Sequence, residues 1–410
     1  LDVLYGLPRY VHFCKKCKMS NQQPMSSNEY VHSKDSKKST MSFDEHGVCH
    51  ACNFNELKET GEIDWEEREQ ELKELCNKHR KNDGSYDCIV GGSGGKDSAM
   101  QSHLLKYKYG MNPLTVTWSP HLYTDIGWKN FQNWLHVGGF DNFLYTPNGK
   151  IHRLLTRNAT LNLLHPFQPF ILGQKTFVAK MAARFNIPLI FYGEMPGEYG
   201  EKISHKTSSY AKTDEVAESE GFTLDYLGGK DVRDVFLGGK QIGEYLDESV
   251  PLVDLMSYLP LDPEVLHQKG IDFKYLGYYK KWVPQEAYYY AVEHTGFEAN
   301  PVRTEGTYSK YNSLDDKVDG FFYFTRWIKF GVGRAMMDAA QEIRNHHIDK
   351  DEGLALMRRY EGEYPLRYEK EFLEYIGMNR EEFLETCDRF RSPHLWKVED
   401  GEWKLRHTPY

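Results

Sequence analysis

Short apolar runs alternate with segments of helical periodicity between residues 88 and 192. Four runs rich in β-branched and aromatic residues predict strands, and four segments whose apolar residues share one helical face predict helices. The strands are expected at residues 88–90, 114–118, 142–145 and 188–192, and the helices at residues 99–109, 127–136, 151–163 and 173–185. Alternation at these lengths predicts an α/β fold with a parallel sheet, in which ligands lie beyond the carboxyl ends of the strands.

Outside this region the pattern changes. A charged amphipathic helix is expected at residues 64–82, just before the first strand. Beyond residue 203 the alternation fades into a polar, acidic and glycine-rich stretch, which predicts either a lid or a variable surface insertion. After this stretch the pattern again predicts a compact region, with a strand followed by a helix at residues 284–297.

The stretch DCIVGGSGGKDSAM, residues 87–100, lies where the first predicted strand gives way to the first helix. Glycines at such a turn let backbone N–H groups approach an anion, and the helix N-terminus adds partial positive charge. The Walker A pattern fails, because Val90 stands where it needs glycine and Asp97 where it needs Ser or Thr. A dinucleotide fingerprint also fails, because its glycine spacing differs and no acidic residue ends the next strand.

The segment SGGKDS at residues 93–98 resembles the pyrophosphate-binding loop of the ATP pyrophosphatases, the PP-loop family, whose pattern is S-G-G-x-D-S. Every fixed position of that pattern is matched in a strand–turn–helix context. In the family this loop holds the β- and γ-phosphates while ATP is cleaved to AMP and pyrophosphate. The resemblance therefore implies an ATP site, and a plain glycine-rich turn is the alternative.

Four of the seven cysteines form two C-x-x-C pairs, which are Cys14 with Cys17 and Cys49 with Cys52. Two such pairs match a tetrahedral zinc site, in which each pair supplies two thiolates. Four sulfur ligands leave no open position for catalysis, so the predicted Zn²⁺ is structural, and disulfides are the alternative. The polar, Ser- and Lys-rich segment between the pairs predicts a mobile loop.

Composition narrows the classes of function. The chain has 410 residues and a net charge of −9. No apolar run approaches the roughly 18 residues that a membrane span needs. We therefore expect a cytoplasmic protein with no membrane partner. This net negative charge provides no overall positive potential that would attract a nucleic acid, so it favours a small-molecule substrate.

Several motifs together resemble the N-acetyl sugar amidotransferases of bacterial surface-polysaccharide (LPS O-antigen) biosynthesis, from about residue 14 to about residue 363. They are CKKC, VCHAC, GGSGGKDS, DIGWKN, FYGE and the C-terminal block TYSKYNSLDDKVDGF…FGVGRAMMDAAQEIRN. The segment between the cysteine pairs looks longer than the family's usual connection. The resemblance implies a zinc ribbon at residues 1–63, a HUP-like (adenine nucleotide alpha hydrolase-like) PP-loop domain at 64–205, an insertion or lid at 206–250, and a mostly helical substrate or partner region at 251–410 that completes the active site.

The resemblance also implies a reaction, in which ATP adenylylates the oxygen of an N-acetyl group on a nucleotide-activated amino sugar. Ammonia then displaces AMP and leaves an acetamidino group. The family's motif, matched position by position, implies that the pyrophosphate portion of ATP is held by Ser93, Gly94, Gly95 and Ser98. Lys96 adds positive charge there, and Asp97 orients the loop or approaches Mg²⁺, which neutralises the phosphates.

Two basic residues of the C-terminal block are candidates for stabilising transition-state charge on phosphate. They are Lys310, in TYSKY, and Arg334, in GVGRA. The competing interpretation is surface ion pairing with Asp315, Asp316 or Asp319.

Residues after two of the strands are further candidates. Glu194 and Glu198, in GEMPGE, are expected to bind a sugar hydroxyl, a metal or ammonia, or else to belong to a solvated acidic loop. Thr117 and Trp118 end the second strand and are candidate nucleotide-binding residues, with Trp118 expected either to pack on adenine or to belong to the core.

The chain shows no signature of a glutaminase, so the ammonia is expected from a partner. Enzymes of the family it resembles work with a glutaminase subunit and a barrel-type subunit, like the pair used in histidine biosynthesis, that channels ammonia. Two other functions stay open, a PP-loop tRNA thiolation enzyme and a non-catalytic zinc-ribbon scaffold. Thiolation would need catalytic cysteines near the nucleotide, yet Cys387 is the only cysteine after Cys88.

Overall fold

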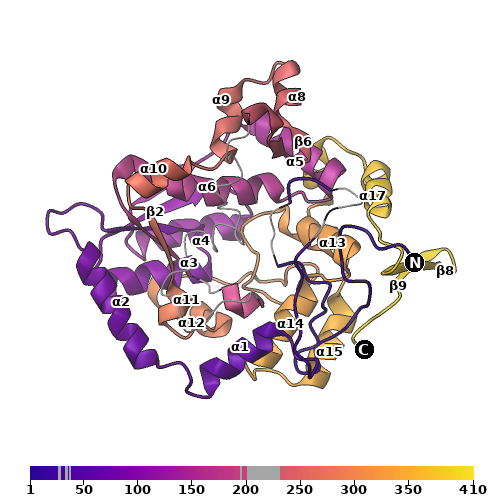
Figure 1. Cartoon of the computed structure of the whole chain (residues 1–410), viewed down its shortest axis with the longest axis horizontal. Coiled ribbons are helices and arrows are strands. Elements are labelled where there is room, and N and C mark those ends of the chain that lie inside the picture. Colours follow the sequence, from indigo (N-terminus) through magenta and orange to yellow (C-terminus); the bar gives the residue numbers. More distant parts are fainter. Residues whose placement is uncertain (26–28, 33–35, 37, 194–195, 201–230) are drawn as a thin grey trace.

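The computed structural model describes residues 1–25, 29–32, 36, 38–193, 196–200 and 231–410 (Figure 1). Five parallel strands form its main sheet, in the order β3-β2-β1-β4-β7. They are β1 (Cys88–Gly91), β2 (Pro113–Trp118), β3 (Asn142–Tyr145), β4 (Leu189–Tyr192) and β7 (Asp272–Tyr275). The first four confirm the predicted strands. The fifth comes from the range that the sequence assigns to the C-terminal region.

The order of the strands defines where ligands are expected. From β1 the chain builds outward through β2 and β3 on one side, and then through β4 and β7 on the other. Strands β1 and β4 therefore flank the point where the connections change direction. In open parallel sheets, ligands bind beyond the carboxyl ends of the strands at such a point.

Helices cover both faces of the sheet (Figure 1). A Cβ atom on Gly91 would meet Val178 of α6, whereas one on the next residue, Gly92, would meet Ser98 of α3 and Trp134 of α4. Successive residues of a strand point to opposite faces, so α6 lies on one face and α3 and α4 on the other. The covering helices are α3 (Lys96–His103) with a π-helical extension (Leu104–Lys108), α4 (Asp125–His136), α5 (Gly149–Leu163) and α6 (Gln168–Phe185). They confirm the four predicted helices.

The remaining elements are mostly helical. Before the sheet lie α1 (His50–Glu59) and α2 (Trp65–His79). Between β4 and α13 lie η2 (Pro196–Tyr199), η4 (Val232–Asp234), β5 (Phe236–Leu237), β6 (Lys240–Gln241), α8 (Ile242–Asp247), α9 (Leu252–Leu255), η5 (Met256–Tyr258), α10 (Pro263–Gln268), α11 (Leu276–Tyr279) and α12 (Pro284–Thr295). The C-terminal region holds α13 (Asp319–Phe330), α14 (Arg334–Arg344), α15 (Lys350–Tyr360), α16 (Glu369–Ile376), α17 (Arg380–Arg389) and the hairpin β8 (Trp396–Glu399) and β9 (Glu402–Leu405).

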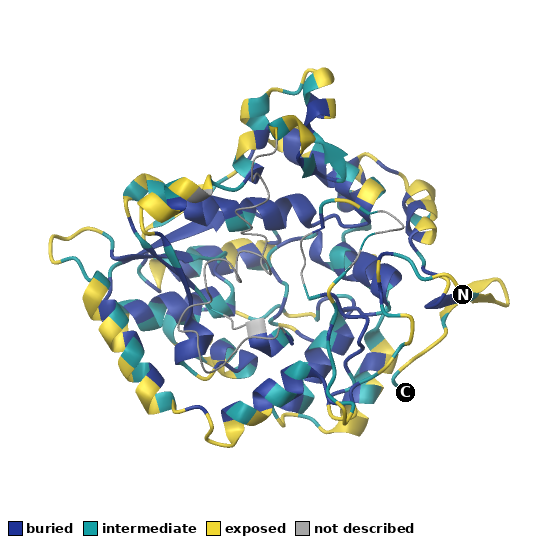
Figure 2. Ribbon diagram, viewed as in Figure 1, coloured by how far each residue is buried: buried dark blue, intermediate teal, exposed yellow. Residues whose placement is uncertain are grey.

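One large hydrophobic core joins these parts (Figure 2). It runs from the cysteine module through the sheet to the C-terminal helices, and a smaller cluster lies around α4 and α12. Aromatic rings fill much of the core, as in the stacked pair Phe321 and Phe372, whose centroids are 3.9 Å apart. Within the described residues, no helix is long and apolar enough to cross a membrane.

Two predicted segments look different in the structure. Of the predicted insertion or lid, residues 206–230 lie outside the described residues, and the rest packs beside α5, where Asn158 hydrogen-bonds Tyr245. The segment between the cysteine pairs was expected to be a mobile loop, but much of its described part is packed against the protein. Ser20 and Gln23, for example, are 2% and 5% exposed. Polar composition misled this prediction because some polar side chains of the segment pair with distant parts of the chain, as Gln22 does with His394 and Glu29 with Lys329.

Candidate active site

The predicted phosphate loop connects β1 to α3. Gly94 has a φ of 85°, and a Cβ atom there would lie 2.8 Å from the Cα atom of Phe131, so this position requires glycine. Gly95 is the N-cap of α3 and brings no capping side chain. The first N–H groups of α3 therefore keep their capacity to bind an anion, which is what a phosphate-binding turn needs.

The two charged residues of the loop contact each other and a distant tryptophan. Lys96 Nζ lies 2.6 Å from Asp97 Oδ2, and the indole Nε1 of Trp282 donates a hydrogen bond to Asp97 Oδ1 at 3.0 Å. Trp282 follows α11 in the chain, and sequence reasoning missed it. Its side chain therefore fixes the Asp97 carboxylate at the loop.

Two cavities meet at the loop. The smaller, of about 250 Å³, lies between the loop and the end of β4, and includes Gly193. The larger, of about 350 Å³, lies between the loop, α4 and the C-terminal helices. Residues that line both are Ser93, Gly95, Asp97, Gln174 and Tyr199. An anion held on the loop would therefore face both cavities.

The wall opposite the loop is built by the segment before α13. Gly127 of the DIGWKN motif allows this wall to approach α4, because a Cβ atom there would lie 2.4 Å from the Cα atom of Asp315. Asp316 accepts hydrogen bonds from the backbone N–H and the Nδ1 atom of His121, at 2.6 and 2.9 Å. The carboxylate of Asp316 therefore joins the two segments, and Asp315, Asp316 and Asp319 all line the larger cavity.

Burial shifts the pKa values of two carboxyl groups in this wall. Burial raises the pKa of Asp315, although a hydrogen bond from Ser93 acts against that shift. Burial, followed by the nearby charges of Asp315 and Asp316, raises the pKa of Asp319 well above its usual range, although Arg334 opposes this. A raised pKa makes a carboxylate a stronger base, so Asp315 and Asp319 are candidates for proton transfer in the cavity.

Arg334 lies at the start of α14 and lines the larger cavity. Its Nε atom lies 2.8 Å from Asp338 Oδ1, and its Nη1 atom donates to the Tyr323 hydroxyl at 2.9 Å. The ion pair forms with a residue of the same helix rather than with the aspartates considered in the sequence. The guanidinium is thus held in place beside the cavity, where it can meet a phosphate.

The structure does not bring every candidate to the cavities. Lys310 is exposed and lines neither of them. The Thr117 side chain accepts a hydrogen bond from Asn142, and Trp118 packs in the core, where Gly173 leaves room for its ring. These two residues line neither cavity.

The two glutamates after β4 have different outcomes. Glu194 lies outside the described residues. Glu198 is buried, and its carboxylate lies 2.6 Å from Lys58 Nζ, so this side chain is paired within the protein and is not part of a solvated loop.

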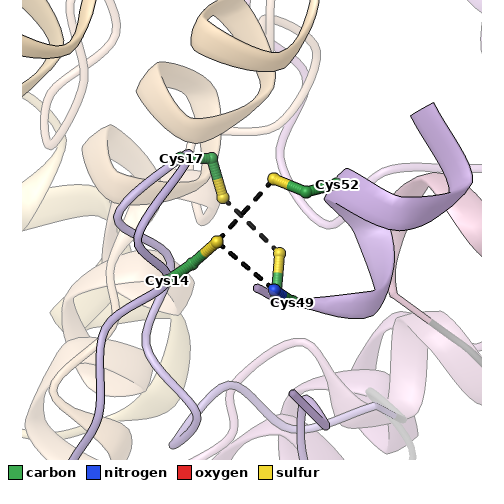
Figure 3. Close-up of side chains that lie close together, drawn as sticks. All are labelled: Cys14, Cys17, Cys49 and Cys52. Atoms are coloured by element: carbon green, nitrogen blue, oxygen red, sulfur yellow. Dashed lines mark hydrogen bonds between the residues drawn. The ribbon is translucent and has the colours of Figure 1, made fainter. Parts of the chain in front are cut away.

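The four cysteines of the two pairs converge at one buried point (Figure 3). Their ligand atoms all lie within 4.8 Å of one another. The sulfur atoms of Cys14 and Cys52 are 3.8 Å apart and those of Cys17 and Cys49 are 3.6 Å apart, too far for disulfide bonds. Tetrahedral zinc with bonds of about 2.3 Å places its sulfur ligands at about this separation. The donor set therefore fits zinc.

The cysteine site adjoins the larger cavity through one residue. Arg344, at the end of α14, donates from Nη1 to Cys17 Sγ at 3.6 Å and from Nη2 to the carbonyl oxygen of Glu198 at 3.2 Å. Arg344 also lines the larger cavity. Helix α14 thus contacts the cavity with Arg334 at its beginning and with Arg344 at its end.

Comparison with known families gives one match within the C-terminal region. Residues 305–408 match the family model described as LPS biosynthesis protein WbpG-like, C-terminal domain. The matched residues include the wall opposite the loop, with Asp315, Asp319 and Arg334. The part of the facing wall within residues 305–408 is therefore similar to a domain of lipopolysaccharide biosynthesis proteins.

A short similarity links the chain to one curated protein, an uncharacterized protein from Methanocaldococcus jannaschii. The two are 42% identical over 52 residues, which is 13% of this chain and 19% of that protein. The match thus spans about a fifth of the relative's length.

Solved structures with similar folds include two synthetases and a thiolase. The NH3-dependent NAD synthetase from Campylobacter jejuni is 14% identical, with 50% of this chain and 92% of that chain covered and a TM-score of 0.28. The NMN synthetase from Francisella tularensis is 12% identical, with 51% and 93% covered and a TM-score of 0.27. The U34-tRNA thiolase NcsA from Methanococcus maripaludis is 11% identical, with 82% and 87% covered and a TM-score of 0.29.

Proposed function

We propose that this protein is an ATP-dependent amidotransferase of surface-polysaccharide biosynthesis. It adenylylates the oxygen of the N-acetyl group on a nucleotide-activated amino sugar and replaces that oxygen with ammonia. The products are an acetamidino sugar, AMP and pyrophosphate. The observation that carries the proposal is the position of the SGGKDS loop, at the end of β1 and opposite a wall similar to a lipopolysaccharide biosynthesis domain.

The chemistry explains why ATP is needed. An amide carbonyl is a poor electrophile, and its oxygen is a poor leaving group. In the first step the acetyl oxygen bonds to the α-phosphorus as the bond to the leaving pyrophosphate breaks. In the second step ammonia adds to the imidate carbon, and the C–O bond breaks so that AMP leaves with the acetyl oxygen. Protons released from the nitrogen must pass to a base.

The loop and α3 are assigned to the phosphates. Backbone N–H groups at the start of α3, together with the hydroxyls of Ser93 and Ser98, would bind the β- and γ-phosphates. Lys96 adds positive charge. Asp97, held by Trp282, would contact Mg²⁺, which keeps several of its ligands as water and phosphate oxygens. Gly94 allows the close approach of the loop to α4 on which this arrangement depends.

The opposite wall is assigned to the acceptor and to proton transfer. Asp315 and Asp319 have raised pKa values and line the larger cavity, so they are suited to take the proton from ammonia after its attack. Arg334 would stabilise negative charge on the α-phosphate. Zinc in the four-cysteine site is structural in this scheme, because four thiolates close its coordination sphere.

The source of ammonia is assigned to a partner. All seven cysteines of the chain are buried, and four of them form the four-cysteine cluster, so none is offered here as the nucleophile of a glutaminase. We propose that a glutaminase subunit produces the ammonia and that a barrel-type subunit channels it to the larger cavity.

One assay tests the function. ATP, Mg²⁺ and ammonium chloride are incubated with the protein and with a panel of nucleotide-linked N-acetyl sugars, and pyrophosphate release is measured. We expect release that depends on one of the sugars. Release that required tRNA and a sulfur donor would replace the proposal with the thiolation function. No release with any acceptor would favour a non-catalytic scaffold.

A further inference from the structure

The segment between the two cysteine pairs reaches the larger cavity. Met19, Gln23 and Met41 line it together with the loop and the C-terminal wall. We propose that this segment recognises the acetamido group of the acceptor, and that Gln23 Oε1 accepts a hydrogen bond from its N–H. This inference rests on the proposed function and adds the group that the site selects.

Gln23 has a buried acceptor that no described residue satisfies. Its side chain is 5% exposed, and its Nε2 atom donates to the carbonyl oxygen of Pro24 at 3.3 Å. That bond sets the orientation of the amide. The Oε1 atom is buried and has no hydrogen-bond partner in the described part of the chain. Buried polar atoms are nearly always hydrogen-bonded, so an acceptor in this position indicates a missing donor.

A hydrogen bond holds the backbone of Gln23, and ion pairs hold a later residue of the same segment. Its carbonyl oxygen accepts a hydrogen bond from the backbone N–H of Met41 at 2.8 Å, which joins the two sides of the segment. Farther along, the buried carboxylate of Glu29 lies 2.5 Å from Lys329 Nζ of α13 and 3.0 Å from Lys38 Nζ. A side chain held this way loses little further entropy when it binds a ligand.

The surroundings match an acetamido group. The Nε2 atom of Gln341, on α14, is a buried donor without a partner in the described residues, and Gln341 lines the same cavity. Met19 and Met41 offer apolar surface and are 4% and 3% exposed. An acceptor, a donor and an apolar surface correspond to the N–H, the carbonyl oxygen and the methyl group of an acetamide.

The contact at Gln23 should also assist the reaction. As the acetyl oxygen attacks phosphorus, positive charge develops on the acetamido nitrogen, and its N–H becomes a stronger donor. Hydrogen bonds to a charged partner are stronger than those between neutral groups. The bond to Gln23 Oε1 therefore strengthens toward the transition state, so its loss should lower kcat as well as raise KM for the sugar.

The test pairs a change in the protein with a change in the ligand. Binding is measured for UDP-N-acetylglucosamine and UDP-N-acetylgalactosamine, and for the parent UDP-glucose and UDP-galactose, which carry a hydroxyl in place of the acetamido group. The wild-type protein should prefer an N-acetyl sugar by about tenfold or more, and Gln23→Leu should remove most of that preference. ATP affinity and metal content should stay unchanged.

Gln22 is the matched control. It neighbours Gln23, but its Nε2 atom donates to the carbonyl oxygen of Pro8 at 2.9 Å, and its Oε1 atom faces His394 Nε2 at 3.2 Å. Gln22→Leu should lower thermal stability and keep the preference for the N-acetyl sugar. If Gln23→Leu does not fold, Gln23→Asn withdraws the acceptor while keeping an amide, and the same loss of preference is expected.

The outcomes separate this inference from the function on which it rests. If the wild-type protein prefers N-acetyl sugars and folded Gln23 variants keep that preference, the inference is wrong and the proposed function stands. If the wild-type protein binds neither N-acetyl sugar more tightly than its parent sugar but releases pyrophosphate with one of them, the inference alone is wrong. If it neither binds nor reacts with any nucleotide-linked N-acetyl sugar of the wider assay panel, both are overturned.

Discussion

The two walls of the larger cavity are built in different ways. The loop wall is one continuous stretch, residues 93–97, whose shape follows from its own glycines and from the helix that it begins. The facing wall is assembled from Met19, Gln23, Met41, Tyr199 and residues 311–344, which meet only in the folded chain. In the proposed function, phosphate binding is therefore encoded locally, whereas the surface proposed to select the acceptor depends on the packing of distant segments.

Disrupting the cysteine site should have the greatest effect on the facing wall and should leave the loop wall intact. Cys17→Ser together with Cys49→Ser should abolish metal binding, because a tetrahedral site cannot be completed, and structural zinc contributes about 10 kcal/mol or more to the folding of small modules. The facing wall should then lose Met19, Gln23 and Met41, while the loop wall remains. We expect loss of acceptor binding with ATP binding retained, as measured by metal analysis and calorimetry.

Cys76→Ser is the control for the cysteine variants, because Cys76 is buried but lies outside the cluster. It should keep its metal. Equal loss of ATP and acceptor binding in the double variant would contradict the independence of the two walls.

The loop wall is tested at Asp97. Asp97→Asn removes the charge that pairs with Lys96 and that is assigned to Mg²⁺, so pyrophosphate release should fall by about two to three orders of magnitude. Asp125→Asn, at an exposed position in the first turn of α4, should behave like the wild type. Near-normal rates in Asp97→Asn would exclude the assigned role.

The facing wall is tested by two basic residues that the sequence alone cannot rank. Arg334 lines the cavity, whereas Lys310 is exposed and lines neither cavity. Arg334→Gln should lower kcat/KM by about 10- to 100-fold, the usual range for a hydrogen bond to a charged group. Lys310→Gln should stay within about twofold of the wild type. The reverse ranking would mean that the wall is misassigned.

The smallest expected effect concerns the helix that carries Arg334. The carboxylate of Glu361 accepts hydrogen bonds from the backbone N–H groups of Gly333 and Met336, at the start of α14. Burial raises the pKa of Glu361 to about 7, from a usual value of 4.5. The folded state therefore binds this proton more tightly than the unfolded state does. The resulting stability is present in full below pH 4.5 and is lost as the pH rises through about 7.

Glu361→Gln removes this titration. The raised pKa means that the stability of the wild-type protein, relative to that of Glu361→Gln, should fall as the pH rises from 4.5 through about 7. The expected fall is about 2 kcal/mol, since partial contact of Glu361 with solvent weakens the effect. Chemical denaturation of both proteins at several pH values measures the difference. Parallel stability curves would show that burial does not shift this group.

Local patterns were sufficient for much of the fold. The periodicity of apolar residues predicted the four strands and four helices around the loop. The spacing of the cysteines predicted that the four of them cluster at one site. Strand β7 was not assigned to the sheet, because it lies far along the chain and four residues carry little pattern. Its place depends on pairing with β4, which only the folded chain decides.

The site was predictable only in part, for the same reason. The loop residues were found because their motif is contiguous. Trp282 and Gln23 were missed, because nothing in the residues next to them indicates a contact with Asp97 or with the cavity. The structure places Trp118 in the core rather than at a cavity because neighbouring rings enclose it, a fact that a strand end alone cannot reveal.

The most direct test of the amidotransferase mechanism follows the acetyl oxygen. The sugar that supports pyrophosphate release is prepared with a heavy oxygen isotope in its acetyl group, and the products are analysed by mass spectrometry. The account predicts that the label appears in AMP, and that the sugar product carries NH in place of the labelled oxygen. Label retained in the sugar, with unlabelled AMP, would contradict the account.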